Sequence, residues 1–221
     1  MSIVTFILGY SGSGKTSSLR NVKTDNARLI QVRKKPLPFK SSEWKYRTKD
    51  VADGNIIVRE TADGILSVFD KLSDNTDIVI VDDFQYVMAM EFMNGIIDKK
   101  STVQGYDRFN SIAKNAYVII DKATRDPTNR RYYFLSHLQR DDEGRESIKT
   151  IGKLLDNKIV LEGLVTIVLN TDIFNDEYVF SVRNNGNNTV KSPIGMFDND
   201  YIPNDLALVD EKIREYYSIT K

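Results

Sequence analysis

The stretch "GYSGSGKT", residues 9–16, directly follows the apolar run "IVTFIL" at residues 3–8. It matches G-x-x-x-x-G-K-[ST], the pattern of a phosphate-binding loop, or P-loop. Glycine tolerates positive φ angles and has no Cβ, so backbone N–H groups in such a loop can point inward at phosphate oxygens. From average composition, the pattern should arise by chance in roughly 1% of chains this long. Between a strand and a helix expected over 14–22, the stretch predicts a nucleoside triphosphate site.

The P-loop assigns a role to each polar residue in it. Lys15 can reach the β- and γ-phosphates and serve catalysis, and the hydroxyl of Thr16 can bind Mg²⁺. The expected ligands are therefore ATP and Mg²⁺. The expected nucleotide-binding residues are Gly9, Tyr10, Ser11, Gly12, Ser13, Gly14, Lys15, Thr16 and Ser17.

A P-loop needs a carboxylate at the end of another buried strand to hold magnesium through water. The run "DIVIVDD", residues 77–83, provides Asp82 and Asp83 at the end of such a strand. We assign Asp82 to the Mg²⁺ site and Asp83 to the attacking water as a candidate catalytic residue. Either aspartate could instead be the N-cap of the helix that follows, and for Asp83 the two readings stay open.

Composition restricts the class of protein. The 221 residues are 41% apolar, enough for a sizeable core, and 31 Lys and Arg balance 31 Asp and Glu. The absence of cysteine excludes disulfides and thiolate metal sites. No run of about 18 apolar residues is present, and the amino end lacks the basic region of a signal peptide. We expect a protein of the cytoplasm.

Short β-branched runs alternate with helical patterns, which predicts an α/β fold with a mostly parallel sheet. Strands are expected at 3–8, 28–32, 55–59, 77–82, 132–136, 164–170 and 178–183. Helices are expected at 14–22, 62–72, 84–98, 106–123, 152–161 and 205–217. The segment "TDIFNDE" predicts an antiparallel hairpin at one edge, and residues 1–221 are expected to form a single domain.

Two strand candidates lie between Lys15 and Asp82, so one or both are expected to separate the P-loop strand from the Asp82 strand. That arrangement resembles RecA-like P-loop ATPases. The chain is also similar to small phage-encoded ATP-binding proteins linked to single-strand annealing, through "GYSGSGKTSSLR", "KKPLPF", "EGLVTIVL" and "KSPIGMF".

The resemblance implies a three-layer RecA-like core, a homo-oligomer with ATP sites between subunits and, for a phage protein, the host cytoplasm. It implies a polar sensor where the strand "RRYYFLSH" ends, which is His137. It also implies a basic residue that enters the neighbouring ATP site, either Lys191 or Arg183.

One feature departs from that family. RecA-like enzymes commonly carry the catalytic glutamate at the end of the strand after the P-loop helix, whereas this chain has Arg33 and Lys34 there. Glu60 or Asp83 could be the base instead, and slow or absent hydrolysis stays open.

A basic segment at 34–49 suggests contact with nucleic acid. Its six basic residues oppose only Glu43, which leaves a net charge of +5, and aromatic residues lie between them. Lysines bind phosphates and aromatic rings stack on bases, so single-stranded DNA is the expected partner. The alternative is a mobile loop whose aromatic rings pack back onto the core. The candidate contacts are Lys34, Lys35, Lys40, Trp44, Lys45 and Arg47.

Two other functions compete with a DNA-dependent ATPase. A nucleotide kinase would need arginines in a mobile lid, and "TRDPTNRR" at 124–131 could supply them. A nucleotide-gated binding module would bind ATP with little turnover.

Overall fold

The computed structural model describes residues 1–97, 105–152 and 159–220. Its strands are β1 (Ile3–Gly9), β2 (Ala27–Gln31), β3 (Ile56–Val58), β4 (Ile78–Asp82), β5 (Arg131–Arg140), β6 (Glu146–Ile148), β7 (Ile167–Phe174), β8 (Glu177–Ser181) and β9 (Tyr201–Pro203). Its helices are α1 (Ala62–Phe69), α2 (Gln85–Ile97), α3 (Gly105–Thr124) and α5 (Leu206–Tyr216), with short 3₁₀ helices η1 (Thr16–Asn21) and η2 (Leu161–Leu164).

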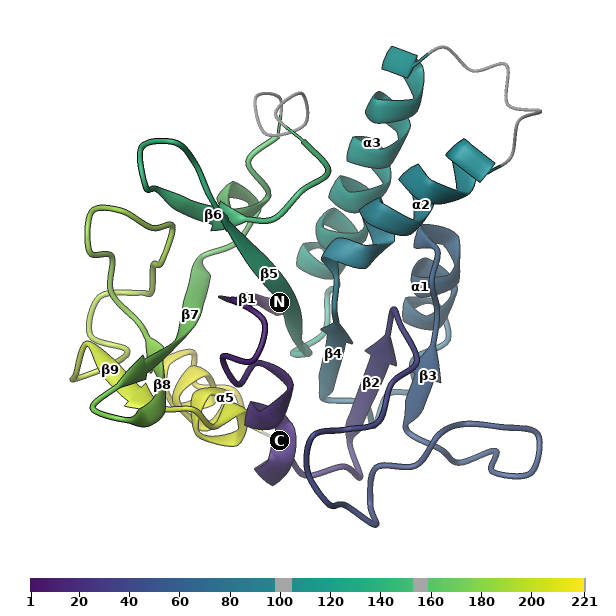
Figure 1. The fold of residues 1–221 in the computed structure, drawn as a ribbon. Coiled ribbons are helices and arrows are strands. Elements are labelled where there is room, and N and C mark those ends of the chain that lie inside the picture. The colour runs from purple at the N-terminus through teal and green to yellow at the C-terminus, as the bar shows by residue number, and fades with distance from the viewer. Residues whose placement is uncertain (98–104, 153–158, 221) are drawn as a thin grey trace.

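The sheet runs in the order β3-β2-β4-β5-β1-β7-β8-β9 (Figure 1). From β3 to β7 all strands are parallel, and β8 and β9 add antiparallel pairs beyond β7. The hairpin expected at "TDIFNDE" is confirmed, with β9 rather than β8 at the edge.

One strand does separate the P-loop strand from the Asp82 strand, but it is neither of the two that were expected there. β5, which follows Asp82 in the chain, lies between β1 and β4. β2 and β3 lie on the far side of β4. Because β4 is central, it can pair with a later strand on one side and earlier ones on the other, which sequence order does not reveal.

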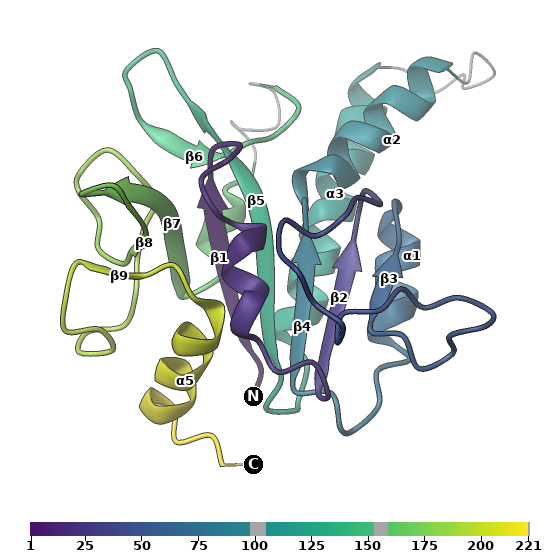
Figure 2. The ribbon, with the colours of Figure 1, turned by 60° about the horizontal axis from the view of Figure 1, so that its bottom comes forward.

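Helices cover both faces of the sheet, which confirms the expected three-layer α/β fold with a mostly parallel sheet. Figures 1 and 2 show α1, α2 and α3 grouped on one face and α5 with η1 on the other. Each face has its own hydrophobic cluster. Phe6, Val81 and Phe134 belong to the cluster under α1–α3, and Ile7 and Ile80 belong to the one under α5. Burial on both faces explains why the central strands read as continuous apolar runs.

Local signals account for the helix limits. The side chain of Thr61 accepts a hydrogen bond from Gly64 N at the start of α1, and Asp205 does the same for Ala207 N at the start of α5. In α5, Leu206, Val209 and Ile213 are buried, as the helical pattern predicts.

Two expected helices differ from the structure. The helix predicted over 14–22 is only the six-residue η1, so its dipole adds little to anion binding. Of the helix predicted over 152–161, residues 153–158 lie outside the described residues, and η2 begins at Leu161. The short strands β6 and β9 were not predicted, because neither lies in an apolar, β-branched run like the one that contains β3.

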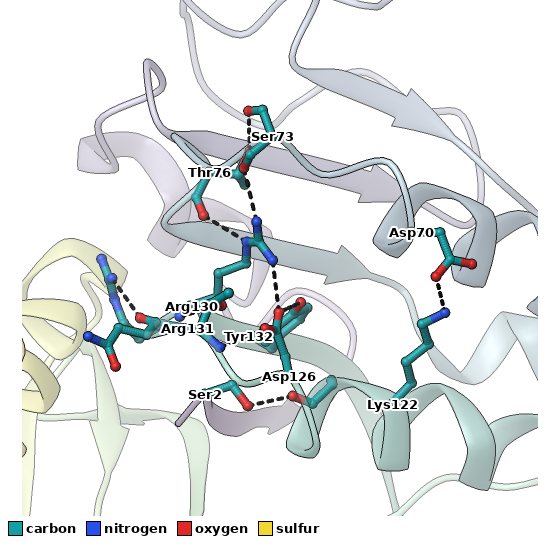
Figure 3. A network of polar contacts seen from close by, with 12 residues as sticks. Ser2, Asp70, Ser73, Thr76, Lys122, Asp126, Arg130, Arg131 and Tyr132 are labelled. Carbon is teal, nitrogen blue, oxygen red and sulfur yellow. Dashed lines mark hydrogen bonds and ion pairs between the residues drawn. The ribbon is translucent and has the colours of Figure 1, made fainter.

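A polar network closes the end of the sheet where β5 begins (Figure 3). Arg130 pairs with Asp126 at 3.0 Å and donates to the carbonyls of Thr76 and Ser73, each also at 3.0 Å. The hydroxyl of Tyr132 donates to Asp126 at 2.5 Å. Next to this network, Arg131 forms a buried ion pair with Asp210 of α5 at 2.8 Å.

The arginines of 124–131, considered as a possible kinase lid, lie at the wrong end of the sheet to cover the P-loop. Arg131 is in register with Ile3, at the start of β1, whereas the P-loop begins at Gly9, at its end. Six strand residues span about 20 Å, so the arginines of 124–131 lie at the opposite end of the sheet from the P-loop. They support the fold and cannot cover a nucleotide bound to the same chain.

Candidate nucleotide-binding site

The P-loop conformation depends on its three glycines. Gly12 and Gly14 have φ angles of 79° and 94°, which L-residues with a side chain rarely adopt. A Cβ on Gly9 would lie 1.8 Å from Oγ1 of Thr171 on β7. That hydroxyl contacts Ser13 Oγ and donates to the carbonyl of Leu8, so β7 holds the loop at both of its ends.

Lys15 points back into the loop. Its Nζ donates to the carbonyls of Gly9 and Tyr10, both at 2.8 Å, and the residue is only 6% exposed. Burial lowers the pKa of Lys15 to about 8, against the opposing charges of Asp82 and Asp83. Phosphate oxygens would replace the two carbonyls and favour the charged ammonium.

Thr16 and Asp82 meet across the sheet as expected for a magnesium site. The Thr16 hydroxyl lies 3.1 Å from both carboxylate oxygens of Asp82. Burial, reinforced by Asp83, raises the pKa of Asp82 to about 6. A bound cation would favour its ionised form.

The donor set fits Mg²⁺ in the way that nucleotide sites use it. Among the described residues, no group of three or more His, Cys, Asp or Glu side chains is placed so that it could hold a metal ion by itself. Mg²⁺ usually keeps several waters and binds one or two carboxylates plus substrate phosphates. Thr16 and Asp82 would hold the ion, which supplies charge neutralisation to the phosphates.

Asp83 lies in a charged cluster beside Asp82. Its carboxylate forms an ion pair with Lys35 and lies 3.8 Å from Nε2 of His137. Burial favours the neutral acid, but His137 and Lys35 outweigh it and lower the pKa of Asp83. His137 is in register with Gly9, so this cluster adjoins the P-loop. The backbone of Asp83 has a φ of 63°, a left-handed conformation that few residues other than glycine adopt.

Three further residues support the site and were not identified from the sequence. Gln85, at the start of α2, accepts hydrogen bonds at 3.2 Å from Ser136 Oγ and from the backbone of His137. Its position directly after Asp82–Phe84, where α2 begins, is a signal in the sequence that could have identified Gln85 as a residue of the site. Thr171 gave no signal, because its contacts join residues distant in the sequence. Gln31, which contacts the Lys35 carbonyl and the Tyr46 hydroxyl, belongs to no recognisable motif.

The P-loop is also tied to the hairpin formed by β5 and β6. The hydroxyl of Tyr10 donates to Glu146 Oε1 at 3.0 Å, and Arg140 pairs with the same carboxylate at 2.7 Å. Burial and Glu146 raise the pKa of Tyr10, so the phenol remains protonated and can keep donating. Movement of the loop around phosphate would therefore reach this hairpin.

Glu60 is not near the P-loop. It follows β3, which lies four strands from β1, or about 19 Å at the usual strand spacing. Its carboxylate pairs with Arg33 at 2.9 Å. The prediction that Glu60 could be the catalytic base is therefore wrong, because β3 forms an edge of the sheet.

The two candidates for a residue acting on a neighbouring subunit lie beyond β7. The backbone of Lys191 pairs with Val168 of β7. Val168 is in register with Phe6 of β1, and Phe6 lies three residues before Gly9. Lys191 is thus displaced from its own P-loop both along and across the sheet. Arg183 is exposed and pairs with Asp200 at 2.8 Å. Action on a second subunit stays a prediction for both.

The basic segment has its charges outside and its aromatic rings inside. Lys34, Lys40, Lys45 and Arg47 are exposed. Trp44 is 7% exposed and belongs to the cluster under α5, with Phe39 and Tyr46 packed partly against it. Trp44 cannot stack on a base in this conformation, which corrects its assignment as a nucleic-acid contact. Its side chain packs in the core because the segment crosses the face of the sheet that α5 covers.

Lys35 belongs to the charged cluster around Asp83 as much as to this segment. Its side chain pairs with Asp83, and its carbonyl accepts hydrogen bonds from Tyr46 Oη at 2.7 Å and Gln31 Nε2 at 3.1 Å. Lys34, its neighbour, instead lies over the ring of Tyr46, 5.2 Å from the centroid. The basic segment is therefore physically connected to the nucleotide site.

Two hollows in the described surface are lined by no residue of the P-loop itself. One, of about 450 Å³, lies between β6 and residues 186–189. The other, of about 800 Å³, lies at the opposite end of the sheet, between Arg130 and α5. Among the described helices, none has the length and apolar content that crossing a membrane requires.

Comparison with known proteins finds similar solved structures but no relative by sequence. No protein-family model and no curated protein matches the chain. One similar structure is that of a DnaB-like replicative helicase and its interactions with primase. It is 15% identical to this chain, with a TM-score of 0.43, and the match covers 79% of this chain and 48% of the helicase chain.

Two secretion ATPases are similar at the same level. A prototypical ATPase from the type III secretion system of pathogenic bacteria is 12% identical, with a TM-score of 0.43 over 77% of this chain and 51% of its own. The type III secretion ATPase EscN from enteropathogenic E. coli is 13% identical, with a TM-score of 0.41, and the match covers 76% of this chain and 42% of EscN. The chain spans about half the length of these proteins, and likeness at this level says nothing of its activity.

Proposed function

We propose that this chain binds ATP with Mg²⁺ and hydrolyses it slowly, as a RecA-like protein that acts on single-stranded DNA in recombination, annealing or replication. The main support for the nucleotide site is the contact, at 3.1 Å, between the Thr16 hydroxyl and a carboxylate oxygen of Asp82 next to the glycine-rich turn. A glycine-rich turn alone could serve many purposes. A hydroxyl and a buried carboxylate placed together beside it serve the metal of a triphosphate.

Asp83 is the residue we propose for positioning the attacking water. It is next to Asp82, within 3.8 Å of His137 and level with the P-loop through the register of His137 with Gly9. Its ion pair with Lys35 holds the carboxylate ionised but also occupies it. Hydrolysis would need this pair to loosen, which supports slow turnover by the isolated chain.

The proposed contact with DNA is electrostatic. Exposed lysines and arginines of 34–49 can bind phosphates, whereas the buried Trp44 removes the expected stacking surface. Affinity should then depend strongly on salt and weakly on base sequence. Lys35 links this surface to Asp83, so DNA bound there can alter the catalytic cluster.

The proposed assembly is a homo-oligomer in which Lys191 or Arg183 of one subunit serves the ATP site of the next. The support is indirect: the backbone of Lys191 lies beside Val168 and not beside the P-loop, and Arg183 pairs with an exposed partner, Asp200. A cation from a second subunit would stabilise charge on the transferred phosphoryl group.

One experiment tests the three parts together. Phosphate release is measured with and without single-stranded DNA over a range of protein concentrations, for the wild type and Lys15→Ala. We expect turnover that rises with DNA and concentration and is lost in Lys15→Ala. Turnover unchanged in Lys15→Ala would exclude the P-loop as its source. Tight ATP binding without phosphate release, even with DNA, would favour a nucleotide-gated binding module.

A further inference from the structure

A nucleotide bound at the P-loop has a phosphate end and a nucleoside end, and the sheet order separates them. Asp82 ends β4, which lies two strands from β1 by way of β5. On the other side, β8 lies two strands from β1 by way of β7. With magnesium and the terminal phosphates at Asp82, the nucleoside extends toward β8.

Two side chains border the P-loop on that side. A Cβ on Gly14 would lie 3.2 Å from Cδ1 of Tyr178 and 3.2 Å from Nδ2 of Asn204. Tyr178 belongs to β8 and is 53% exposed. Its ring therefore offers an open aromatic surface next to the site.

Asn204 carries an unused donor. The residue is 3% exposed, and its Nδ2 has no hydrogen-bond partner among the described residues. A buried amide without a partner is costly and uncommon in native structures. An unpaired polar group next to a binding loop is what a ligand of matching chemistry would satisfy.

The position of Asn204 does not depend on that amide. Its backbone N donates to the carbonyl of Tyr178 at 3.2 Å, and its carbonyl accepts from Arg20 of η1 at 2.6 Å. The next residue, Asp205, accepts from Asn21 at 2.7 Å. Backbone and neighbour contacts thus hold the residue against the P-loop and leave the side chain available.

We propose, on the basis of the nucleotide-binding function proposed above, that Tyr178 and Asn204 form a base subsite that selects adenine. The ring of Tyr178 turns to stack on the purine and uncovers the amide. Asn204 then donates from Nδ2 to N7 and accepts from the N6 amino group, the pairing that asparagine makes with adenine. Guanine has O6 next to N7, so one atom of the amide would face a second acceptor.

The wild-type protein tests this directly. Competition against ribose-labelled ATP, at saturating Mg²⁺, is measured for ATP, GTP, 7-deaza-ATP and inorganic tripolyphosphate. We expect ATP to bind about tenfold or more tightly than GTP, in the range of one bidentate amide–base pair, and 7-deaza-ATP to bind more weakly than ATP. Equal affinities for ATP and GTP, or for ATP and 7-deaza-ATP, overturn the proposal.

Variants separate the roles of the two residues. Asn204→Leu should bind ATP and GTP equally and bind tripolyphosphate as the wild type does. Tyr178→Ala should weaken ATP and GTP by a similar factor, and Tyr178→Phe should behave as the wild type because stacking needs no hydroxyl. A preference for ATP that persists in a folded Asn204→Leu removes the role of the amide. If that variant does not fold, the wild-type comparison with 7-deaza-ATP decides.

Competition by tripolyphosphate distinguishes a failure of the base subsite from a failure of the nucleotide-binding function on which it rests. Tripolyphosphate that fails to compete, or ATP affinity that is unchanged in Lys15→Ala, removes the nucleotide site and the base subsite with it. Tripolyphosphate that competes, together with equal binding of ATP and GTP, leaves the phosphate site intact and overturns only the base subsite.

Discussion

The Thr16 hydroxyl lies 3.1 Å from both carboxylate oxygens of Asp82, although the two residues belong to segments of the sheet separated by β5. The side-chain oxygens that we propose as magnesium ligands therefore lie next to each other. Phosphate bound in the P-loop would replace the carbonyls of Gly9 and Tyr10 as the partners of Lys15.

Asp82→Asn should abolish the effect of magnesium on nucleotide affinity. We expect ATP to bind the wild type at least about tenfold more tightly with Mg²⁺ than without, because metal charge stabilises the phosphates. In the variant, the two affinities should be similar. Asp77→Asn, just before the same strand, is the matched control and should retain the magnesium effect. A full magnesium effect in Asp82→Asn would exclude Asp82 from the metal site.

Lys35→Ala should shift the pH dependence of hydrolysis. Lys35 helps to lower the pKa of Asp83, so its removal raises that pKa. A base works when ionised and loses activity as pH falls through its pKa, so the acid limb of the profile should move to higher pH. The profile is measured at saturating Mg²⁺, which keeps Asp82 ionised.

Lys34→Ala is the control for that shift, because Lys34 lies over Tyr46 rather than at Asp83. Its acid limb should match that of the wild type. An acid limb that Lys35→Ala leaves in place would mean that Asp83 is not the titrating base.

Substitutions in the basic segment should separate stability from DNA binding. Trp44→Ala should lower the free energy of unfolding by about 3–5 kcal/mol, because it removes a large buried side chain. Trp44→Phe should cost less, since Nε1 has no hydrogen-bond partner among the described residues. Urea denaturation measures both.

Lys45→Ala should leave stability within about 0.5 kcal/mol and reduce the salt slope of single-strand affinity by about 0.7. The slope is obtained from binding isotherms at several salt concentrations. A salt slope equal to that of the wild type would remove Lys45 from the DNA surface.

Asp126→Asn should destabilise the fold by about 1–2 kcal/mol at neutral pH. Burial opposes ionisation, but hydrogen bonds from Tyr132, Thr128 and Arg130 outweigh it and lower the pKa of Asp126 to about 2. Because the native pKa lies below the unfolded one, the stabilisation is complete above about pH 4 and is lost as pH falls toward 2. The difference between wild type and variant in urea denaturation should shrink over that range.

Asp70→Asn provides the comparison in the same region of Figure 3. Asp70 pairs with Lys122, but its side chain is 60% exposed, so the expected cost is below about 1 kcal/mol. Equal costs for the two variants would contradict a special role for Asp126.

Mixing two inactive variants should test the action of Lys191 on a second subunit. Lys15→Ala lacks a working P-loop, and Lys191→Ala lacks the proposed trans cation. In a mixed oligomer, the P-loop of a Lys191→Ala subunit can receive Lys191 from a Lys15→Ala subunit, so phosphate release should recover in part. No recovery from subunits shown to exchange would argue against trans action. Arg183→Ala in place of Lys191→Ala tests the other candidate.

Much of the nucleotide site was predictable because its signals are local. Gly9 to Thr16 form one continuous motif, and Asp82 ends an apolar run that only a central strand would tolerate. The ion pair between Lys35 and Asp83 and the contact of Thr171 with Gly9 were not predictable, since each joins segments far apart in the chain.

By itself, the amino-acid sequence determined the α/β class, the phosphate loop and the carboxylate that faces it, because hydrophobic period and glycine placement act over a few residues. Only the tertiary structure decided that β5 lies between β1 and β4, that Glu60 is far from the loop, and that Trp44 faces the core. Those outcomes depend on which strands and surfaces pack together, and packing is a competition among distant segments that no short pattern encodes.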